Sequence, residues 1–203
     1  MGIKASRHEW LVFTEPNCRP QSNQWLKQMA RNFTPATEIV LGYSNYEKVP
    51  GWLNKKITFD TLLNSMRYLG MALSGHPYMG TGRNLAYRKT LYYKQKGFAS
   101  HLNLQRGEDD LFINETAHAH NTRVETGSDS LMRIAMPKYK KIWCEEKISY
   151  AATSRLFKGT ARYIMGFETC SRLLFYVAII ATIVISIPVS YTHLRAHETC
   201  ADL

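Results

Sequence analysis

The amino-acid sequence predicts an α/β fold in which a mixed or parallel sheet is flanked by helices. Short apolar runs that suit buried strands alternate with longer segments that have helical spacing. Residues 10–43 follow the order strand, helix, strand, which is typical of a βαβ unit. A third observation sets the end of the chain apart, because residues 173–187 form an uncharged apolar run.

The first strand is expected at Trp10–Phe13, an apolar run with charged residues before it. Apolar residues on both faces are typical of a strand inside a parallel sheet. Pro16 cannot continue the hydrogen-bond ladder, so residues 15–20 are expected to be a loop at the carboxyl end of this strand. Loops at that end are where open α/β sheets bind ligands.

A helix capped by Ser22 is expected at residues 22–33, and a second strand at residues 39–43. Residues 45–51 are polar and are expected to be a loop. A long helix is then expected at residues 52–73. Its apolar residues recur near helical spacing and are Leu53, Ile57, Leu62, Met66, Leu69 and Leu73.

The next segments are shorter. Residues 78–87 contain two glycines and are expected to be a loop that runs into a short strand. A basic helix is expected at residues 89–96, with Gly97 ending it. A helix with an acidic first turn is expected at residues 109–118, and an alternating strand at residues 122–125 suits the edge of the sheet.

The last part of the chain points to a membrane. Residues 138–158 form a basic amphipathic pattern with aromatic side chains, which suits a helix in a membrane interface. The 15-residue apolar run at 173–187 is shorter than the ~20 residues that span a bilayer. We interpret it as a transmembrane helix that the end of the sequence cuts short. Lys158, Arg162 and Arg172 flank it and place the preceding domain on the cytoplasmic side of the cell inner membrane or its equivalent.

Residues 188–203 look foreign to the protein. They match one reading frame of a transposon-type sequencing adapter, so we expect them to be non-native. The expected domain organisation is therefore a catalytic part at 1–137, an interface helix at 138–166, a truncated transmembrane helix at 167–187 and a foreign tail at 188–203.

The composition of the chain favours some classes of binding partner over others. Lys and Arg number 26 and Asp and Glu number 16, which gives a formal net charge of +10. This balance indicates an anionic partner, which is a nucleic acid, a nucleotide or an anionic membrane surface. The apolar run near the end favours a membrane surface over nucleic acid. The four cysteines are scattered, which favours reduced thiols over a disulfide framework or a zinc site.

An acidic cluster stands out in this basic chain. Glu108, Asp109 and Asp110 follow a glycine and precede an apolar pair. Adjacent carboxylates repel one another when ionised, which raises a pKa toward the range that a general base needs. The alternative is an acidic first turn of a helix, which the helix dipole favours. The cluster alone leaves both interpretations open.

Four features occur in order along the chain. They are a strand that ends in Glu15-Pro16-Asn17, the segment Gly80-x-Gly82-x-Asn84-Leu85-Ala86-Tyr87, the segment Gly107-Glu108-Asp109-Asp110-Leu111, and a basic aromatic helix before an apolar run. Together they resemble a membrane-anchored family 2 glycosyltransferase of the GT-A fold, over residues 2–187. The resemblance implies a partial GT-A-type sheet. It begins in the middle of that fold, so the first strands are expected before Met1 and the chain alone is expected to be inactive.

The resemblance implies a metal site. In that family a strand ends in an Asp-x-Asp motif that binds a divalent cation on the nucleotide-sugar diphosphate. Mg²⁺ and Mn²⁺ prefer such oxygen ligands and neutralise the leaving group. The matching positions here are Glu15 and Asn17. Asn17 departs from the pattern, because its amide oxygen is a weaker ligand than a carboxylate.

The resemblance also implies catalytic and binding residues. Asp109 would be the base that takes a proton from the acceptor hydroxyl during inverting transfer, and a one-residue shift of the alignment would give this role to Asp110. Glu108 would orient a neighbour or pair with an arginine. The implied substrate-binding residues are Gly80, Gly82, Arg83 and Asn84. The glycines would let the backbone approach the ligand, and Arg83 would add charge for the diphosphate.

The implied function is transfer of a sugar from a nucleotide-sugar donor to a glycan or lipid-linked acceptor. Processive members of the family carry a Gln-x-x-Arg-Trp motif, which residues 143–150 lack, so transfer of one sugar at a time is expected. Two alternatives remain. One is a non-catalytic basic protein of the membrane surface, and the other is a glycosyltransferase-like protein that has lost catalysis, to which Asn17 points.

Overall fold

The computed structural model describes residues 2–95, 107–137 and 139–201, with the side chains of all of these except 160–161 and 187–201. The chain divides into two compact units, Met1–Lys158 and Gly159–Leu203. The elements of the first unit, in chain order, are α1 (Gly2–Ala5), β1 (Trp10–Phe13), β2 (Cys18–Pro20), α2 (Trp25–Ala30), β3 (Ile39–Gly42), β4 (Ser44–Tyr46), α3 (Trp52–Leu73), β5 (Leu85–Arg88), α4 (Lys89–Lys94), α5 (Glu108–Thr116), β6 (Thr122–Glu125), the 3₁₀ helix η2 (Ser128–Ser130), β7 (Met132–Ile134) and α6 (Lys140–Ser154).

The larger sheet is mixed, in the strand order β1-β5-β3-β6. Strand β5 runs antiparallel to both β1 and β3, and Val12 and Val40 pair with the same residue, Ala86. Strands β1 and β3 therefore run in the same direction with β5 between them. The expected βαβ order is present, but its two strands are not neighbours. β3 and β6 are parallel, and β6 lies at the edge of the sheet as predicted.

A second sheet was not predicted. It has three strands in the order β2-β7-β4. The expected loop at residues 15–20 contains β2. The expected polar loop at residues 45–51 begins inside β4, because residues 45 and 46 belong to that strand. Each strand has three residues, so no run is long enough to show an alternating pattern. Pro20 is tolerated in β2 because β2 is an edge strand.

The core forms where the central strands meet the helices. All four residues of β3 are buried, and so are the first three residues of β5. Strand β1 was expected to be buried on both faces, but only Leu11 is buried among its residues. The reason is its position, since β1 is the outermost strand of the sheet and pairs with β5 alone. A second cluster of buried residues joins the small sheet to α3 and α6 and contains Tyr46, Ile57 and Ile134.

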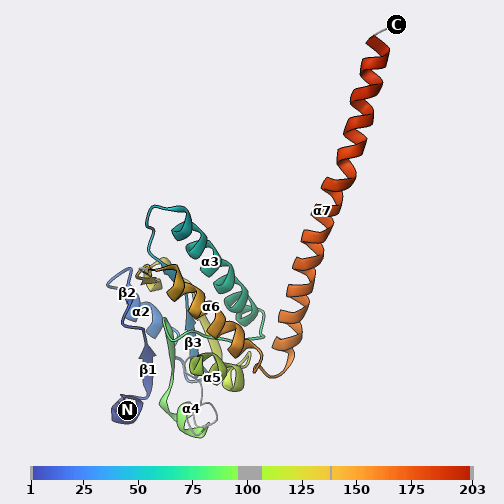
Figure 1. Ribbon diagram of the computed structural model, residues 1–203. Coiled ribbons are helices and arrows are strands. Elements are labelled where there is room, and N and C mark those ends of the chain that lie inside the picture. Colours follow the sequence, from blue (N-terminus) through green and yellow to red (C-terminus); the bar gives the residue numbers. More distant parts are fainter. Residues whose placement is uncertain (1, 96–106, 138, 202–203) are drawn as a thin grey trace. The chain divides into compact units, whose positions relative to one another are not determined.

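Helix α3 has the predicted bounds but buries a different face from the one that apolar spacing alone suggests. Ile57 and Leu69 are buried as core residues, whereas Met66 and Leu73 are 62% and 70% exposed. The buried face is completed by Ser65, Tyr68 and Ala72. Figure 1 shows α6 beside α3, and an ion pair between Lys147 and Asp60 joins the two helices.

Helix α6 belongs to the first unit by its packing. Thr153 is buried, and Trp143 packs against the cluster of the small sheet. The role of residues 138–166 in a membrane interface stays a prediction. The predicted end of α4 at Gly97 lies outside the described residues.

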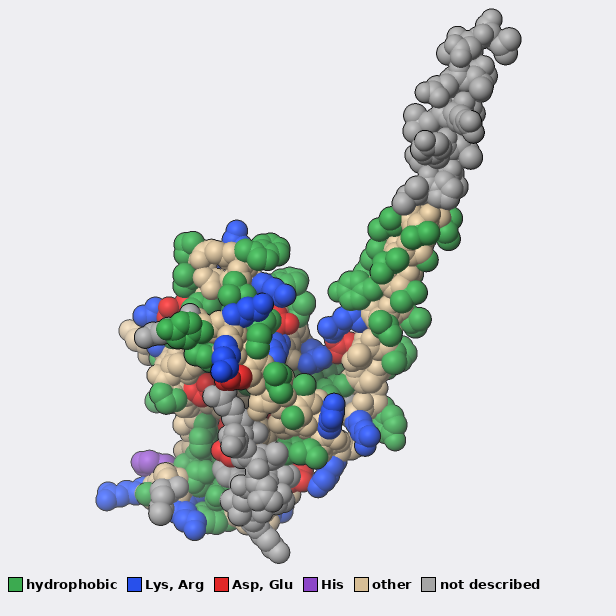
Figure 2. Space-filling view, viewed as in Figure 1, with side chains coloured by type: hydrophobic (Ala, Val, Ile, Leu, Met, Phe, Trp, Pro, Cys, Tyr) green, Lys and Arg blue, Asp and Glu red, His purple; other side chains and the backbone are tan. Residues whose placement is uncertain are grey.

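The second unit is one helix, α7 (Thr160–Ala201). Its segment Arg162–Ser186 has 25 residues and is long and apolar enough to cross a membrane. Figure 2 shows apolar side chains around this helix as far as its side chains are described. The helix continues through the residues that were expected to be a foreign tail, and their origin stays a prediction.

Candidate active site

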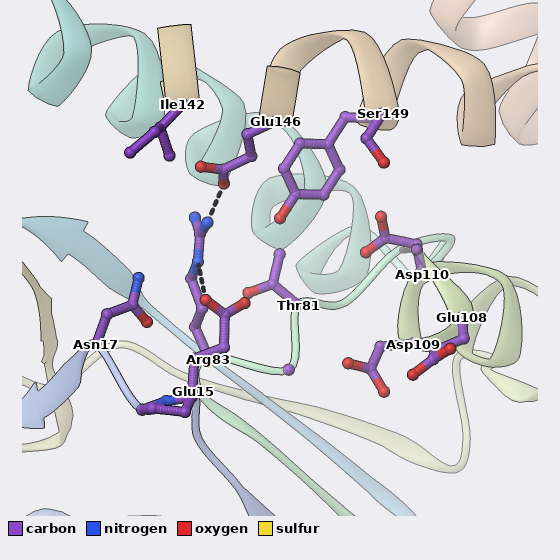
Figure 3. A pocket seen from close by; sticks show the side chains of 14 residues that line it. Glu15, Asn17, Thr81, Arg83, Glu108, Asp109, Asp110, Ile142, Glu146 and Ser149 are labelled. Atoms are coloured by element: carbon purple, nitrogen blue, oxygen red, sulfur yellow. Dashed lines mark hydrogen bonds and ion pairs between the residues drawn. The ribbon is translucent and has the colours of Figure 1, made fainter. Parts of the chain in front are cut away.

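One cavity of the first unit brings together most of the residues that sequence analysis selected. Its volume is about 360 Å³. Four segments build its wall: the turn after β1, the loop before β5, the start of α5 and one face of α6 (Figure 3). The lining residues are Glu15, Pro16, Asn17, Thr81, Gly82, Arg83, Gly107, Glu108, Asp109, Asp110, Ile142, Glu146, Ser149 and Tyr150.

Two of the selected residues, Gly80 and Asn84, do not line this cavity. The Asn84 amide donates to the backbone oxygens of Tyr43 and Ser130, at 2.8 and 2.9 Å. Its Oδ1 accepts a hydrogen bond from Trp25 Nε1 at 3.0 Å. Asn84 therefore ties the loop before β5 to the sheet, and its role in binding substrate stays a prediction.

Gly80 lies against the core. A Cβ at this position would come within 2.7 Å of Leu41 Cδ2 and 3.1 Å of Ile113 Cγ1. The glycine therefore lets the loop pass close to β3 and α5. Its role in binding substrate also stays a prediction.

The start of α5 places the carboxylates. Gly107 caps the helix in the left-handed conformation, with φ of 88°, and this turns the chain into the helix. Glu108, Asp109 and Asp110 then form its first turn. Leu111 and Phe112 are buried behind them and fix the helix against the sheet. Figure 3 shows Glu108 and Asp109 on one side of the cavity, with Glu15 and Asn17 on the other.

The Asp109 carboxyl has a raised pKa. Burial, together with the nearby Glu108 and Glu15, raises the pKa of this carboxyl to about 6. The helix N-terminus favours the ionised form, but burial and the two carboxylates outweigh it. A base with a pKa near the working pH combines ionisation with affinity for a proton. Gly82 makes room for this side chain, because a Cβ there would overlap Asp109 Oδ2.

Asp110 lies deeper than Asp109. It is 2% exposed, and burial, followed by the neighbouring Asp109, raises the pKa of its carboxyl well above the ordinary value. Arg83 opposes this shift without cancelling it. The Asp110 carboxyl therefore holds its proton to a higher pH than an exposed aspartate does. Burial is the largest cause of the raised pKa at both Asp109 and Asp110.

The opposite wall is organised by Arg83. Its Nε lies 3.3 Å from Glu15 Oε2, and its Nη2 pairs with Glu146 Oε1 (Figure 3). Tyr46 Oη donates to the second oxygen of Glu146 at 3.0 Å. The Arg83 side chain is 9% exposed and Glu146 is 14% exposed, so this is a largely buried pair between the loop before β5 and α6.

Sequence analysis missed Glu146. It lies in the segment 143–150 that was inspected for a Gln-x-x-Arg-Trp motif, and its partner is 63 residues away in sequence. A local pattern does not show such a pairing. The signal that was available is a glutamate in a basic helix that precedes an apolar run.

The residues at the end of β1 do not fit a divalent cation. The Glu15 carboxylate already accepts Arg83, and Asn17 offers a neutral amide whose Oδ1 accepts a contact from Cys18 Sγ at 3.6 Å. Among the described residues, no three His, Cys, Asp or Glu side chains come together in a way that holds a metal ion. A buried guanidinium next to the carboxylate also repels a second cation. We therefore derive no step that passes through a metal ion.

Comparison with known proteins bears on the fold. No protein-family model matches the chain, and no curated protein matches it. A solved structure that does match is the mannosyltransferase PcManGT from Pyrobaculum calidifontis, in complex with GDP-Man and Mn²⁺. The TM-score is 0.51 at 17% sequence identity, over 81% of this chain. The similarity concerns the fold that the two chains share. The mixed sheet with its flanking helices is consistent with a GT-A-like fold, and this confirms the predicted fold class.

The structural similarity covers only part of the mannosyltransferase. This chain spans 41% of the length of the mannosyltransferase. At 17% identity the comparison concerns the fold, and the residues of the cavity must carry any argument about chemistry.

Proposed function

We propose that this chain carries the acceptor side of the active site of an inverting glycosyltransferase. The enzyme would move a sugar from a nucleotide-sugar donor to a glycan or lipid-linked acceptor. The observation that carries the proposal is Asp109, a carboxyl with a pKa raised to about 6 that lines a cavity of about 360 Å³. The glycosyltransferase fold and the GDP-Man bound to the mannosyltransferase support the class of donor.

In the proposed reaction the ionised Asp109 takes the proton of an acceptor hydroxyl. The acceptor oxygen forms a bond to the anomeric carbon as the bond from that carbon to the diphosphate oxygen breaks. The electron pair of the broken bond leaves with the nucleoside diphosphate. Attack from the face opposite the leaving group inverts the anomeric configuration, and this needs one base and no protein nucleophile.

Arg83 is proposed to face the donor diphosphate. It is the one cationic side chain among the lining residues that the structure describes. Its two ion pairs engage two of its five N–H groups, and Glu15 and Glu146 hold the planar guanidinium in a fixed direction. This arrangement orients the guanidinium before the donor arrives.

Membrane attachment is proposed through α7, with the catalytic unit on the cytoplasmic side. The apolar segment Arg162–Ser186 supports attachment. The outward face of α3 adds support, because it combines exposed apolar side chains with Lys55 and Lys56 and has no acidic residue among its exposed positions. Apolar and basic side chains on one helix face suit an anionic membrane surface.

The test of the proposed function is Asp109→Asn in the full-length protein, with release of nucleoside diphosphate from GDP-Man as the first assay. The proposal predicts loss of transfer with donor affinity retained. Unchanged turnover would remove Asp109 as the base. Membrane binding without transfer in the parent protein would favour the non-catalytic alternative.

A further inference from the structure

Several buried polar side-chain atoms of the described residues form no hydrogen bond of ordinary geometry, and three of these atoms belong to residues that lie near one another. They are Asp110 Oδ2, Thr81 Oγ1 and Tyr68 Oη. The three residues are 2%, 9% and 1% exposed. An unpaired polar atom that is shielded from water costs free energy, so most such atoms in proteins are paired. Three of them together indicate a place that a ligand completes.

The three atoms lie around the boundary between two cavities. Asp110 and Thr81 line the large cavity. Thr81 also lines a small cavity of about 30 Å³, and Tyr68 lies on the wall of this second cavity. Burial raises the pKa of Tyr68 to about 12, and the Thr81 and Ser65 hydroxyls lie close enough to oppose this rise, although Tyr68 Oη forms no hydrogen bond of ordinary geometry.

The chemistry of the three groups suits a neutral ligand group that both donates and accepts hydrogen bonds. The Asp110 carboxyl accepts hydrogen bonds through its oxygens and, when protonated, also donates through its O–H, and the hydroxyls of Thr81 and Tyr68 both donate and accept. A phosphate is disfavoured beside Asp110, because the charge of the adjacent Asp109 acts on this place more strongly than the opposite charge of Arg83. A sugar hydroxyl has the required size, neutrality and hydrogen-bond capacity.

We propose that Asp110, Thr81 and Tyr68 form a subsite for a hydroxyl group of a pyranose. The hydroxyl enters from the large cavity, bonds to Asp110 and Thr81, and faces Tyr68 across the small cavity. This inference deepens the proposed function and rests on it. It also gives Asp110 a role distinct from that of Asp109, because Asp110 binds the substrate and Asp109 accepts the proton.

The first arm of the test asks whether the hydroxyls are unpaired in the free protein. Thr81 and Thr116 have the same exposed fraction, 9%, but the Thr116 hydroxyl donates to the Phe112 carbonyl at 2.7 Å. We expect Thr116→Val to lower Tm and Thr81→Val to leave it unchanged or raise it. An equal fall in Tm for both variants would show that the Thr81 hydroxyl has a partner in the free protein, and would overturn the subsite.

Tyrosine offers a second matched pair for this arm. Tyr68 and Tyr46 are 1% and 3% exposed, and Tyr46 Oη donates to Glu146. We expect Tyr46→Phe to lower Tm and Tyr68→Phe to leave it unchanged. A fall in Tm for Tyr68→Phe as large as that for Tyr46→Phe would count against the subsite.

The second arm measures binding of defined probes by ligand-observed NMR on the full chain. The probes are methyl α-D-mannopyranoside, which presents hydroxyls without a diphosphate, and GDP-Man. We expect Asp110→Ala and Thr81→Val each to weaken probe binding about five- to tenfold, the effect of one lost hydrogen bond. Asp110→Asn keeps a donor and an acceptor and is expected to retain most of the affinity.

The outcomes separate this subsite from the proposed function. One outcome is that the glycoside binds in a way that depends on Thr81 and Asp110, whereas GDP-Man does not bind. This result supports the subsite and indicates that it holds a hydroxyl of the acceptor sugar. It also contradicts a donor of the GDP-Man type. Dependence of GDP-Man binding on the same residues places the subsite on the donor sugar. Binding of neither probe, or binding that both variants leave unchanged, would overturn it.

Discussion

The two walls of the cavity use carboxylates in opposite ways. On the α5 wall, Asp109 is held among other carboxylates and apolar surroundings, and the pKa of its carboxyl rises to about 6. On the β1 wall, Glu15 is 39% exposed and pairs with the guanidinium of Arg83. A carboxylate without a cation becomes a base, and a carboxylate with one becomes a fixed anion that positions its partner. The same functional group, a carboxyl, therefore has two roles that are set by its neighbours.

The largest effect is expected from removing the base. Asp109→Asn removes the proton acceptor with little change in shape, so transfer should fall about 10²–10⁴-fold. Affinity for the donor should stay close to that of the parent protein, because the change leaves Arg83 and its partners Glu15 and Glu146 unaltered. Steady-state kinetics and donor titration measure the two quantities. Asp110→Asn is the comparison, and a large loss in this variant with transfer retained in Asp109→Asn would reverse the roles of the two aspartates.

The ion pairs on the opposite wall can be broken by Arg83→Met. This change leaves Glu146 largely buried and without its cation, so the free energy of unfolding should fall by roughly 3 kcal/mol. Lys141→Met is the control, since Lys141 Nζ lies 3.8 Å from Glu145 Oε1 and the two side chains are 84% and 60% exposed. That change should lower the free energy of unfolding by at most ~1 kcal/mol. Chemical denaturation measures both values, and equal effects would mean that the Arg83 pair contributes no more than a surface pair.

The distance between the walls can be disturbed without changing any polar group. Gly82→Ala places a Cβ against Asp109 Oδ2 and forces the carboxylate to move. A displacement of about 1 Å costs about 10²-fold in rate. Gly70→Ala in α3 is the control, because a Cβ at Gly70 has nothing within 4 Å and alanine favours a helix. Transfer assays on both variants test this, and full activity in Gly82→Ala would show that Asp109 is not confined by the loop.

The smallest effect concerns pH and stability. Because the pKa of Asp109 is raised to about 6 in the folded protein, the folded state binds more protons than the unfolded state between the ordinary value of 3.8 and about 6. Stability should therefore fall as pH rises through this window. Asp109→Asn should make the curve of unfolding free energy against pH flatter there. A curve that is identical for parent and variant would contradict a raised pKa at this position.

Much of the larger sheet could be predicted from the sequence. Trp10–Phe13 and Ile39–Gly42 are apolar runs, and α3 has the bounds that its flanking residues predict. The first turn of α5 follows from three acidic residues after a glycine. The order of the strands was not accessible in this way, because the insertion of β5 between β1 and β3 depends on pairing between residues far apart in sequence.

The candidate site was predictable only in part. Motif residues at the ends of β1 and α5 do meet in the cavity. The pairing of Arg83 with Glu146 was hidden because it joins a loop to a helix that had been interpreted as a membrane element. Asn84 was selected by its place in a glycine motif, but the polar atoms of its amide are engaged by backbone oxygens and by Trp25. Residue type alone does not tell a ligand from a structural hydrogen bond.

The proposed base catalysis depends most on the protonation of Asp109. The direct measurement is a ¹³C NMR titration of the aspartate side-chain carboxyl carbons in the full chain, with Asp109 assigned as the resonance that disappears in Asp109→Asn. We expect this resonance to titrate with a midpoint at a pH of about 6. A midpoint near 3.8, the ordinary value for an aspartate, would contradict the assignment of Asp109 as the base.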